Sequence, residues 1–348
     1  MHTKIRHICT MKRISFILLL LIFSASVSAQ NAKAIIGFYN LENLFDTKDD
    51  PKKNDDDFTP KGSYAYTTAI LKMKLQNIAD VVSQMGVQDN SDGPAILGVA
   101  EVENRYVLEE LVKQRKIRDR KYKIVHFESP DNRGIDVALL YQAKYFRVLS
   151  AKALTVNLGE LGDTRPTRDI LFVSGRLRGE LIHVFVNHWP SRRGGESASA
   201  PKRNKGAAVC KKVIDSLIAD DADVKYVVMG DMNDDPTNES VSKILGAEGK
   251  LKKLKPGGMY NPFMKLYKNG IGSNAWQDSW SLFDQIIVSE SFFNKGKGGL
   301  KFSHNEVFNR SFLIQQSGRY KGYPKRSFSW GVWNDGYSDH FPTMVYLK

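Results

Sequence analysis

The residues that could do chemistry begin with two polar side chains at the end of an apolar run. Residues 226–229 are apolar over the length of a strand, Gly230 interrupts them, and Asp231 and Asn233 follow. Residues two apart in an extended chain face the same side. A carboxylate and a carboxamide therefore point together off the end of a buried strand, although a turn after a strand uses the same residue types.

Further polar residues stand at or just past the ends of other expected strands. They are Asn40, Glu42, Glu101, His188, Asp284, Asp339 and His340. Strand ends at one edge of an α/β sheet converge on the crevice where ligands bind. Carboxylates without thiolates and with few imidazoles favour a hard cation, Mg²⁺ or Mn²⁺, over zinc. The two histidines beside acids supply acid–base capacity, and Asp284 could orient one of them.

The elements that must position these groups follow from the spacing of apolar residues. Helical spacing predicts a helix over residues 66–85, ended by Gly86, and two more from residue 107 and over 207–219. Strands are predicted over residues 34–40, 94–100, 122–127, 133–141, 170–177, 181–186, 226–229, 281–288 and 343–347. Because the strands are separated by helices or hairpins, with no linker apparent between them, the sequence predicts one α/β domain.

Seven segments of the chain, in the same order, are similar to the endonuclease/exonuclease/phosphatase family. This family of metal-dependent phosphoesterases includes pancreatic deoxyribonuclease, abasic-site endonucleases, secreted bacterial nucleases and neutral sphingomyelinases. The matching segments are residues 39–44, 100–104, 134–141, 187–191, 230–233, 283–288 and 338–340. The resemblance implies a four-layer α/β sandwich, with two mixed β-sheets packed face to face and helices on both outer sides, and a divalent-metal-dependent activity.

The resemblance also implies roles for the acids at the strand ends. Glu101 resembles the principal metal carboxylate, with Asn40 and Asp339 completing or supporting the metal site. Glu42 stands where some members of the family carry an accessory acid. Asp231 resembles the residue that holds or activates the attacking water. Either Asp231 or His340 takes the proton of that water, and the sequence leaves this choice open.

The remaining implied roles concern the phosphate. Asn233 resembles a phosphate-positioning donor, and His340, oriented by Asp284, resembles the second acid–base group and a phosphate contact. His188 resembles the family histidine at the scissile phosphate. Arg168 resembles an arginine that clamps the phosphate.

Residues 1–29 have the pattern of a secretory signal peptide. Lys12 and Arg13 precede an apolar run over residues 14–23, and small residues allow cleavage after Ala29. The run is too short to span a bilayer, so we expect no membrane anchor. The predicted product is a catalytic domain of residues 30–348, located in the periplasm or outside the cell. Because Cys9 leaves with the signal peptide, Cys210 remains alone and no disulfide is expected.

The charge of the chain favours a polyanionic substrate. The formal net charge is +13, and loss of residues 1–29, which hold four basic residues and no acid, leaves +9. A basic surface attracts nucleic acid. A flexible basic loop over residues 192–203 supplies Arg192 and Arg193 as candidates for substrate binding. Trp189 and Trp280 are candidates for stacking on bases.

These features favour a secreted endonuclease acting on DNA or RNA. One alternative is a phosphatase or phosphodiesterase of a lipid or small phosphoester, similar to a sphingomyelinase. It would need an apolar membrane-docking loop, and no aromatic hairpin in the sequence clearly qualifies. A second alternative is a nucleic-acid-binding module without activity, against which the complete set of acids argues. No stable protein partner is implied, and a monomer is expected. The acid-rich loop over residues 46–57 is a surface loop or the site of a second cation such as Ca²⁺.

Overall fold

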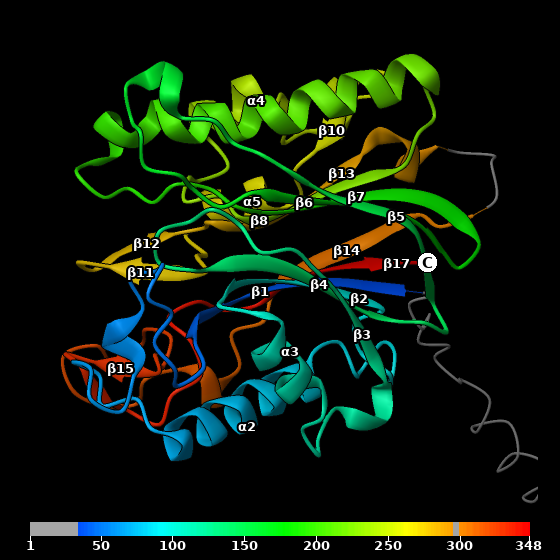
Figure 1. The fold of residues 1–348 in the computed structure, drawn as a ribbon. Coiled ribbons are helices and arrows are strands. Elements are labelled where there is room, and N and C mark those ends of the chain that lie inside the picture. The colour runs from blue at the N-terminus through cyan, green and yellow to red at the C-terminus, as the bar shows by residue number, and fades with distance from the viewer. Residues whose placement is uncertain (1–33, 295–298) are drawn as a thin grey trace, which may run out of the picture. The chain divides into compact units, whose positions relative to one another are not determined.

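The apolar runs of the sequence become the strands of two β-sheets (Figure 1). The structure, a computed structural model, describes residues 34–294 and 299–348. The strands of the first sheet are β1 (Ala34–Leu44), β2 (Ile96–Val102), β3 (Tyr122–His126), β4 (Asp136–Gln142), β14 (Phe302–Val307) and β17 (Thr343–Leu347). Their order is β14-β17-β1-β2-β4-β3, and β1 lies parallel to β2 and antiparallel to β17. The first sheet is therefore mixed.

The second sheet is built from the middle of the chain. Its strands are β5 (Phe146–Leu154), β6 (Ile170–Leu177), β7 (Glu180–His188), β8 (Tyr226–Asp231), β9 (Ala247–Glu248), β10 (Met259–Tyr260) and β13 (Asp284–Ser289). Their order is β5-β6-β7-β8-β13-β10-β9. Since β8 lies parallel to β7 and antiparallel to β13, this sheet is mixed as well.

Helices cover the outer face of each sheet, as Figure 1 shows. The helices are α2 (Thr68–Gln84), α3 (Arg105–Val112), α4 (Glu196–Asp220) and the short α5 (Phe263–Lys268). Ile78 of α2 is buried in the core that contains the first sheet. Cys210 of α4 is buried in a second core, against the outer face of the second sheet. The structure thereby confirms the predicted four-layer sandwich.

The two sheets approach closely just below the strand ends that carry the polar residues. Gly98 lies in the middle of β2, where an added Cβ would be 2.9 Å from the sulfur of Met229 and 3.1 Å from Val186. Such distances leave no room for a larger residue. Glycine at this position thus lets β2 pack tightly against β7 and β8, three residues before Glu101.

Helix α4 begins well before its predicted start at residue 207. Residues 196–206 form its first three turns and contain Pro201, although residues 196–203 were expected to belong to a flexible basic loop. Arg203 is fully buried there, and its Nε lies 2.6 Å from Oδ1 of Asp234. The prediction of a loop was wrong because this pairing of a buried arginine with a distant aspartate leaves no periodic signal in the sequence.

Two small hairpins lie on one side of the molecule, at the left of Figure 1. One joins β11 (Asn274–Trp276) to β12 (Ser279–Ser281), and the other joins β15 (Phe328–Ser329) to β16 (Val332–Trp333). The predicted strand over residues 281–288 therefore begins at Asp284, because Ser281 pairs within the first hairpin.

The predicted signal peptide lies outside the described residues. The extent of the mature domain, residues 30–348, therefore remains a prediction. Among the helices of the described part, none combines the length and the apolar character needed to cross a bilayer.

Candidate active site

Three strands of the second sheet place three predicted site residues side by side. His188 ends β7 and pairs with Asp231, the last residue of β8. Asp284 begins β13 and pairs with Asp231 from the other side. Because β13 runs antiparallel to its neighbours, two strands end and a third begins at the same rim. All three residues are buried there.

The first sheet adds three groups from the opposite side. Asn40, fully buried in β1, donates from Nδ2 to Oδ2 of Asp231 at 3.0 Å, across the two sheets. Its Oδ1 accepts the N–H of Glu42 at 2.9 Å. Glu101 lies in β2 with a φ of +58°, and its Oε2 accepts the N–H of Asn43 at 2.9 Å. Left-handed backbone at a non-glycine residue costs energy and concentrates at functional sites.

His340 and Asp284 form a buried, hydrogen-bonded pair. Nδ1 of His340 lies 2.6 Å from Oδ2 of Asp284, which also accepts from the hydroxyl of Ser273 at 2.5 Å. Nε2 of His340 lies 3.9 Å from Oδ2 of Asp231. Burial by itself lowers the pKa of His340, but the charges of Asp284 and Asp231 outweigh burial and raise that pKa well above its usual value. The ring is therefore held protonated, with Nε2 directed toward Asp231.

Asp231 occupies the centre of the site. Its Oδ1 accepts the N–H of Asn233 at 2.9 Å, and its Oδ2 accepts the side chain of Asn40. Burial, together with the charge of Asp284, raises the pKa of Asp231 to about 7, against the lowering effect of the His340 charge. Such a carboxylate is fixed in orientation and can accept a proton near neutral pH.

We predict that kcat/KM rises with pH on its acidic side. Only the ionised Asp231 can take a proton from water, so activity should increase about tenfold per pH unit below its pKa. A bound cation lowers that pKa, so the rise should level off at or below pH 7. The measurement is kcat/KM between pH 4 and 9 with saturating Mg²⁺. Activity that stays constant below pH 6 would contradict this role of Asp231.

His188 differs from His340 in its protonation. Its Nε2 lies 3.7 Å from Oδ2 of Asp231 and 3.8 Å from Oε1 of Glu101. Burial lowers the pKa of His188 well below its usual value, and the charge of Arg168 lowers it further. His188 is therefore neutral at physiological pH. Two histidines on either side of one aspartate thus present one charged and one uncharged ring.

Arg168 lies behind His188 and is buried. Its Nε and Nη2 donate to the backbone carbonyls of His188 and Trp189, at 3.2 and 2.8 Å. Its Nη1 lies 3.3 Å from Oδ2 of Asp131. The guanidinium thus fixes the end of β7. Its predicted role as a phosphate clamp stays a prediction, and these contacts describe a positioning residue instead.

The oxygen atoms around Glu101 fit a hard cation. In the described part of the chain, no hydrogen-bond donor reaches Oε1 of Glu101. Asn40 Oδ1 accepts a single hydrogen bond, and Asp339 is half-buried with its Oδ1 4.0 Å from Nε2 of His340. Two carboxylates and a carboxamide are the ligands that Mg²⁺ and Mn²⁺ prefer. Separately, ligand-type atoms of Asp231, Asp284 and His340 lie within 4.8 Å of one another, but the hydrogen bond between the last two leaves this group better suited to acid–base chemistry.

Glu42 is surrounded by protein donors. Its Oε1 lies 3.3 Å from Nε of Arg326, and its Oε2 accepts the N–H of Ser327 at 2.6 Å. Burial and then the charge of Asp339 raise the pKa of Glu42 to about 7. With both oxygens occupied, Glu42 supports the site as a nearby charge in this structure, and its predicted role as a metal ligand stays a prediction.

The sequence reasoning missed the fully buried Lys74. Its Nζ donates to the hydroxyl of Ser327 at 2.6 Å, and burial lowers its pKa to about 8. The charges of Glu42, Asp339 and Glu101 act against this lowering, so the ammonium interacts electrostatically with these acids. A signal was present, because Lys74 falls between Leu71 and Ile78 on the apolar face of α2.

The predicted substrate-binding residues near residue 190 differ in their surroundings. Arg192 donates to the carbonyl of Asn233 at 2.9 Å and to Oδ2 of Asp235 at 3.1 Å, whereas Arg193 is exposed. Asn233 itself donates to the carbonyl of Trp189 at 2.9 Å. The interpretation of Trp189 as a base-stacking residue is wrong, because its side chain is buried against Gly206 of α4.

The acid-rich loop after β1 satisfies several of its own backbone groups. Asp46 accepts the N–H of Lys48 at 2.6 Å, and Asp55 accepts the N–H of Asp50 at 3.1 Å. Asp46 and Asp55 are both buried. A second cation at this loop stays a prediction.

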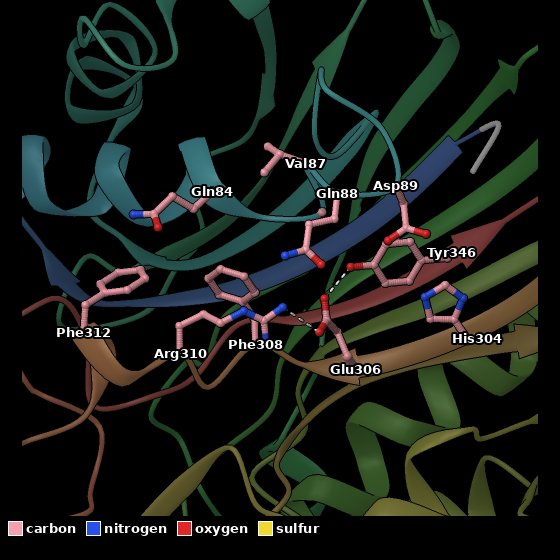
Figure 2. A pocket seen from close by; sticks show the side chains of 11 residues that line it. Gln84, Val87, Gln88, Asp89, His304, Glu306, Phe308, Arg310, Phe312 and Tyr346 are labelled. Carbon is pink, nitrogen blue, oxygen red and sulfur yellow. Dashed lines mark hydrogen bonds and ion pairs between the residues drawn. The ribbon is translucent and has the colours of Figure 1, made fainter. Parts of the chain in front are cut away.

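A cavity of about 460 Å³ lies away from this site (Figure 2). It is bordered by the end of α2 and by β14, and it includes Tyr346, which pairs with Ile35 at the beginning of β1. The catalytic candidates stand at the other end of β1. None of the residues that line this cavity belongs to the predicted site.

A two-sheet sandwich whose acids and imidazoles meet at one rim, beside oxygen ligands for a hard cation, has the architecture of a metal-assisted phosphoester hydrolase. Residues 35–348 match the Endonuclease/Exonuclease/phosphatase family. The chain belongs to this family and is a hydrolase of phosphoester bonds, and members of the family typically use a divalent metal ion. The comparison with curated proteins gives no significant match.

Solved structures share the fold at low sequence identity. A humanized D. rerio TDP2 has a TM-score of 0.53 and 14% identity, covering 90% of this chain and 98% of that chain. D. rerio TDP2 complexed with a single strand DNA product has a TM-score of 0.50 and 14% identity, with the same coverage. The mannosyl-6-phosphatase Bt3783 of Bacteroides thetaiotaomicron has a TM-score of 0.53 and 16% identity, covering 90% and 99%. These similarities establish the fold.

Proposed function

We propose that the protein is a divalent-metal-dependent endonuclease that hydrolyses phosphodiester bonds in DNA or RNA. The observation that carries the hydrolytic part is Asp231, held between neutral His188 and protonated His340 with its Oδ2 3.7 and 3.9 Å from their Nε2 atoms. The preference for nucleic acid is supported by the net charge of +13 and by the DNA product bound to the structurally similar D. rerio TDP2.

The residues divide the work of hydrolysis among them. Asp231, fixed by Asn40 and Asn233, orients the attacking water and accepts its proton. Protonated His340 donates to the phosphate or to the leaving oxygen, and neutral His188 contacts the phosphate without adding charge. Donors aimed at the charge that develops in the transition state are the main source of rate enhancement in such sites.

The residues that would hold the metal are Glu101, Asn40 and Asp339. Mg²⁺ or Mn²⁺ at these oxygens would neutralise negative charge on the phosphate. Glu42 and Lys74 lie behind them and adjust the local charge.

A parallel assay tests the proposal. Protein of residues 30–348 is incubated with supercoiled plasmid, RNA, sphingomyelin and p-nitrophenyl phosphate, each with Mg²⁺ and with EDTA. We expect cleavage of plasmid or RNA with Mg²⁺ and none with EDTA. Hydrolysis of sphingomyelin or of the monoester alone would overturn the nuclease assignment and favour the phosphatase or lipid alternative, which the fold shared with Bt3783 keeps open.

Salt provides a second test of a polyanionic substrate. Because Lys and Arg contacts to phosphates release counterions, the KM for plasmid should rise steeply with salt, about tenfold or more between 50 and 200 mM NaCl. The KM for bis(p-nitrophenyl) phosphate, a small phosphodiester measured as a control, should change far less. Equal salt dependence for the two substrates would argue against an extended nucleic-acid interface.

We also propose that residues 1–29 direct secretion, and that the mature protein acts as a monomer without a membrane anchor. The basic segment followed by the short apolar run supports export. N-terminal sequencing of the protein recovered from the periplasm and the medium tests this, and a start at Met1 or Met11 in the cytosol would contradict it.

A further inference from the structure

Two exposed tryptophans project from the two small hairpins. Trp276 of β11 is 70% exposed, and Trp330, in the turn between β15 and β16, is 85% exposed. Val332 beside it is 68% exposed. No aromatic hairpin suited to docking on a membrane is apparent in the sequence, whereas the structure has two hairpins that each expose a tryptophan. This exposure could not be predicted, because the exposure of an aromatic residue depends on packing rather than on its neighbours in the chain.

The turns of the two hairpins contain residues with strained, left-handed backbone. Trp330 has a φ of +53° and Gly331 a φ of +78°, and in the other hairpin Gln277 and Asp278 have φ values of +47° and +61°. Two successive positive φ values are typical of a type I′ hairpin turn, which favours Asn and Gly. A bulky residue in the left-handed region is strained. Since Trp330 gains little packing in return, its presence there points to a contact outside the chain.

The second hairpin is anchored on the acids of the site. Ser327, directly before β15, donates its N–H to Oε2 of Glu42 at 2.6 Å. Arg326 lies 3.2 Å from Oδ2 of Asp339. On the far side of the hairpin, Asn334 donates its N–H to the carbonyl of Ser327 at 2.8 Å. Trp330 is therefore carried at the end of a short hairpin whose base touches the predicted metal site.

The first hairpin is anchored on the acid–base pair. Ser273, directly before β11, donates its hydroxyl to Oδ2 of Asp284 at 2.5 Å. Asn274 pairs with His340 and donates from Nδ2 to the carbonyl of Asp339 at 2.9 Å. Both hairpins thus rise from residues that contact catalytic candidates, and Figure 1 shows them on the same side of the molecule.

We propose that Trp276 and Trp330 form a stacking platform that binds unpaired bases of single-stranded nucleic acid next to the scissile phosphate. This inference rests on the proposed nuclease function and names the form of the substrate. An indole stacks on any base, and basic side chains nearby hold the phosphates between bases. The segment before the second hairpin supplies two such exposed side chains, Arg319 and Lys321.

The surroundings of the indoles favour bases over a membrane surface. Asp278 stands in the turn next to Trp276, and Asp335 follows β16 two residues after Trp333. Inserting the tip of the first hairpin into a bilayer would carry the carboxylate of Asp278 toward the apolar region, which is costly. The two indoles also stand on separate hairpins, and polar residues, Gln277, Asp278 and Ser279, directly follow Trp276, whereas a membrane-docking tip has contiguous apolar residues.

Binding measurements without cleavage test the platform. Fluorescein-labelled oligothymidylate is titrated with the protein in EDTA, and fluorescence anisotropy gives Kd. Trp330→Asn and Trp276→Ser should each raise Kd about tenfold, the size expected for one lost stacking contact. Trp330→Tyr, which keeps an aromatic face, should restore most of the affinity. Leu181→Ala, at the opposite end of β7 from His188, is the control and should leave Kd unchanged.

Thermal unfolding separates this role from a structural one. Asparagine tolerates the left-handed conformation better than tryptophan, so Trp330→Asn should keep or raise Tm while it weakens binding. If Trp330 had a structural role instead, Trp330→Asn would lower Tm. The platform would be overturned if both tryptophan variants kept the Kd of the original protein for the oligonucleotide. It would also be overturned if the variants lost binding to phosphatidylcholine–phosphatidylserine vesicles while their Kd for the oligonucleotide stayed unchanged.

The same measurements distinguish the two proposals. Tight binding through the tryptophans without cleavage in Mg²⁺ would overturn the nuclease function and leave the platform standing. If Trp276→Ser and Trp330→Asn bind the oligonucleotide as tightly as the original protein and still cleave plasmid, the platform is overturned and the nuclease function stands.

Discussion

His340→Gln is expected to lower kcat/KM by about 10³-fold, or about 4 kcal/mol of transition-state stabilisation. His340 is held protonated by the buried Asp284 at 2.6 Å, so its Nε2 is a charged donor in a water-poor site. An uncharged amide cannot supply that proton. Steady-state kinetics on plasmid or on a chromogenic phosphodiester gives the effect.

Glutamine is chosen because an alanine at this position would also leave the buried carboxylate of Asp284 without its charged partner. Asp284 is fully buried, and removal of the whole imidazole would strand its charge, which destabilises proteins strongly. The glutamine amide can donate to Asp284 in place of Nδ1. Asp284→Asn is the matched variant, and it should shift the basic side of the pH profile to lower pH because the charge that raises the pKa of His340 is gone. Activity of folded His340→Gln within tenfold of the original protein would remove His340 from the mechanism.

Glu101→Gln is expected to abolish activation by metal at ordinary Mg²⁺ concentrations. Within the described residues no hydrogen-bond donor reaches Oε1 of Glu101, and this half-buried oxygen is therefore a strong candidate ligand for a hard cation. Loss of one ligand charge should weaken metal affinity by at least about 100-fold, since even the partners of ligands contribute 10- to 100-fold. Mn²⁺ binding followed by electron paramagnetic resonance measures affinity independently of turnover.

A matched control keeps this result specific. Glu109 lies on the exposed side of α3, where it pairs with Arg105, and Glu109→Gln should leave both Mn²⁺ affinity and activity unchanged. Equal Mn²⁺ affinity in Glu101→Gln and the original protein would place the metal elsewhere in the site.

The buried parts of the fold could be predicted from the sequence, and the edges could not. Strand β8 and the beginning of β1 are apolar runs buried on both faces, which indicate strands directly. Strand β5 was missed because it lies at the edge of its sheet with most of its residues at least partly exposed. The first turns of α4 were missed because the ion pair between Arg203 and Asp234, rather than an apolar stripe, fixes them.

The candidate site shows the same division. Polar residues directly after buried strands, such as Asp231, could be found because strand ends converge. The apolar neighbours of Lys74 on its helix were a signal of its burial, but its role and that of Ser273 could not be assigned, since their contribution consists of contacts with residues more than ten positions away. The surroundings of Arg168 and Trp189 were also beyond the sequence, because only packing decides whether a large side chain faces the substrate or the protein interior.

One hydrogen bond has implications for how relatives of this protein can be recombined. The amide of Asn40 reaches Asp231 across the space between the sheets, so each sheet supplies only half of a working centre. A chimaera that takes its two sheets from different parents would inherit both halves intact. It would still lose activity if the distance between the two sheets differed between the parents by an ångström. Divergence within such a lineage is therefore expected to be coupled: changes that reposition one sheet survive only when the facing sheet changes with it.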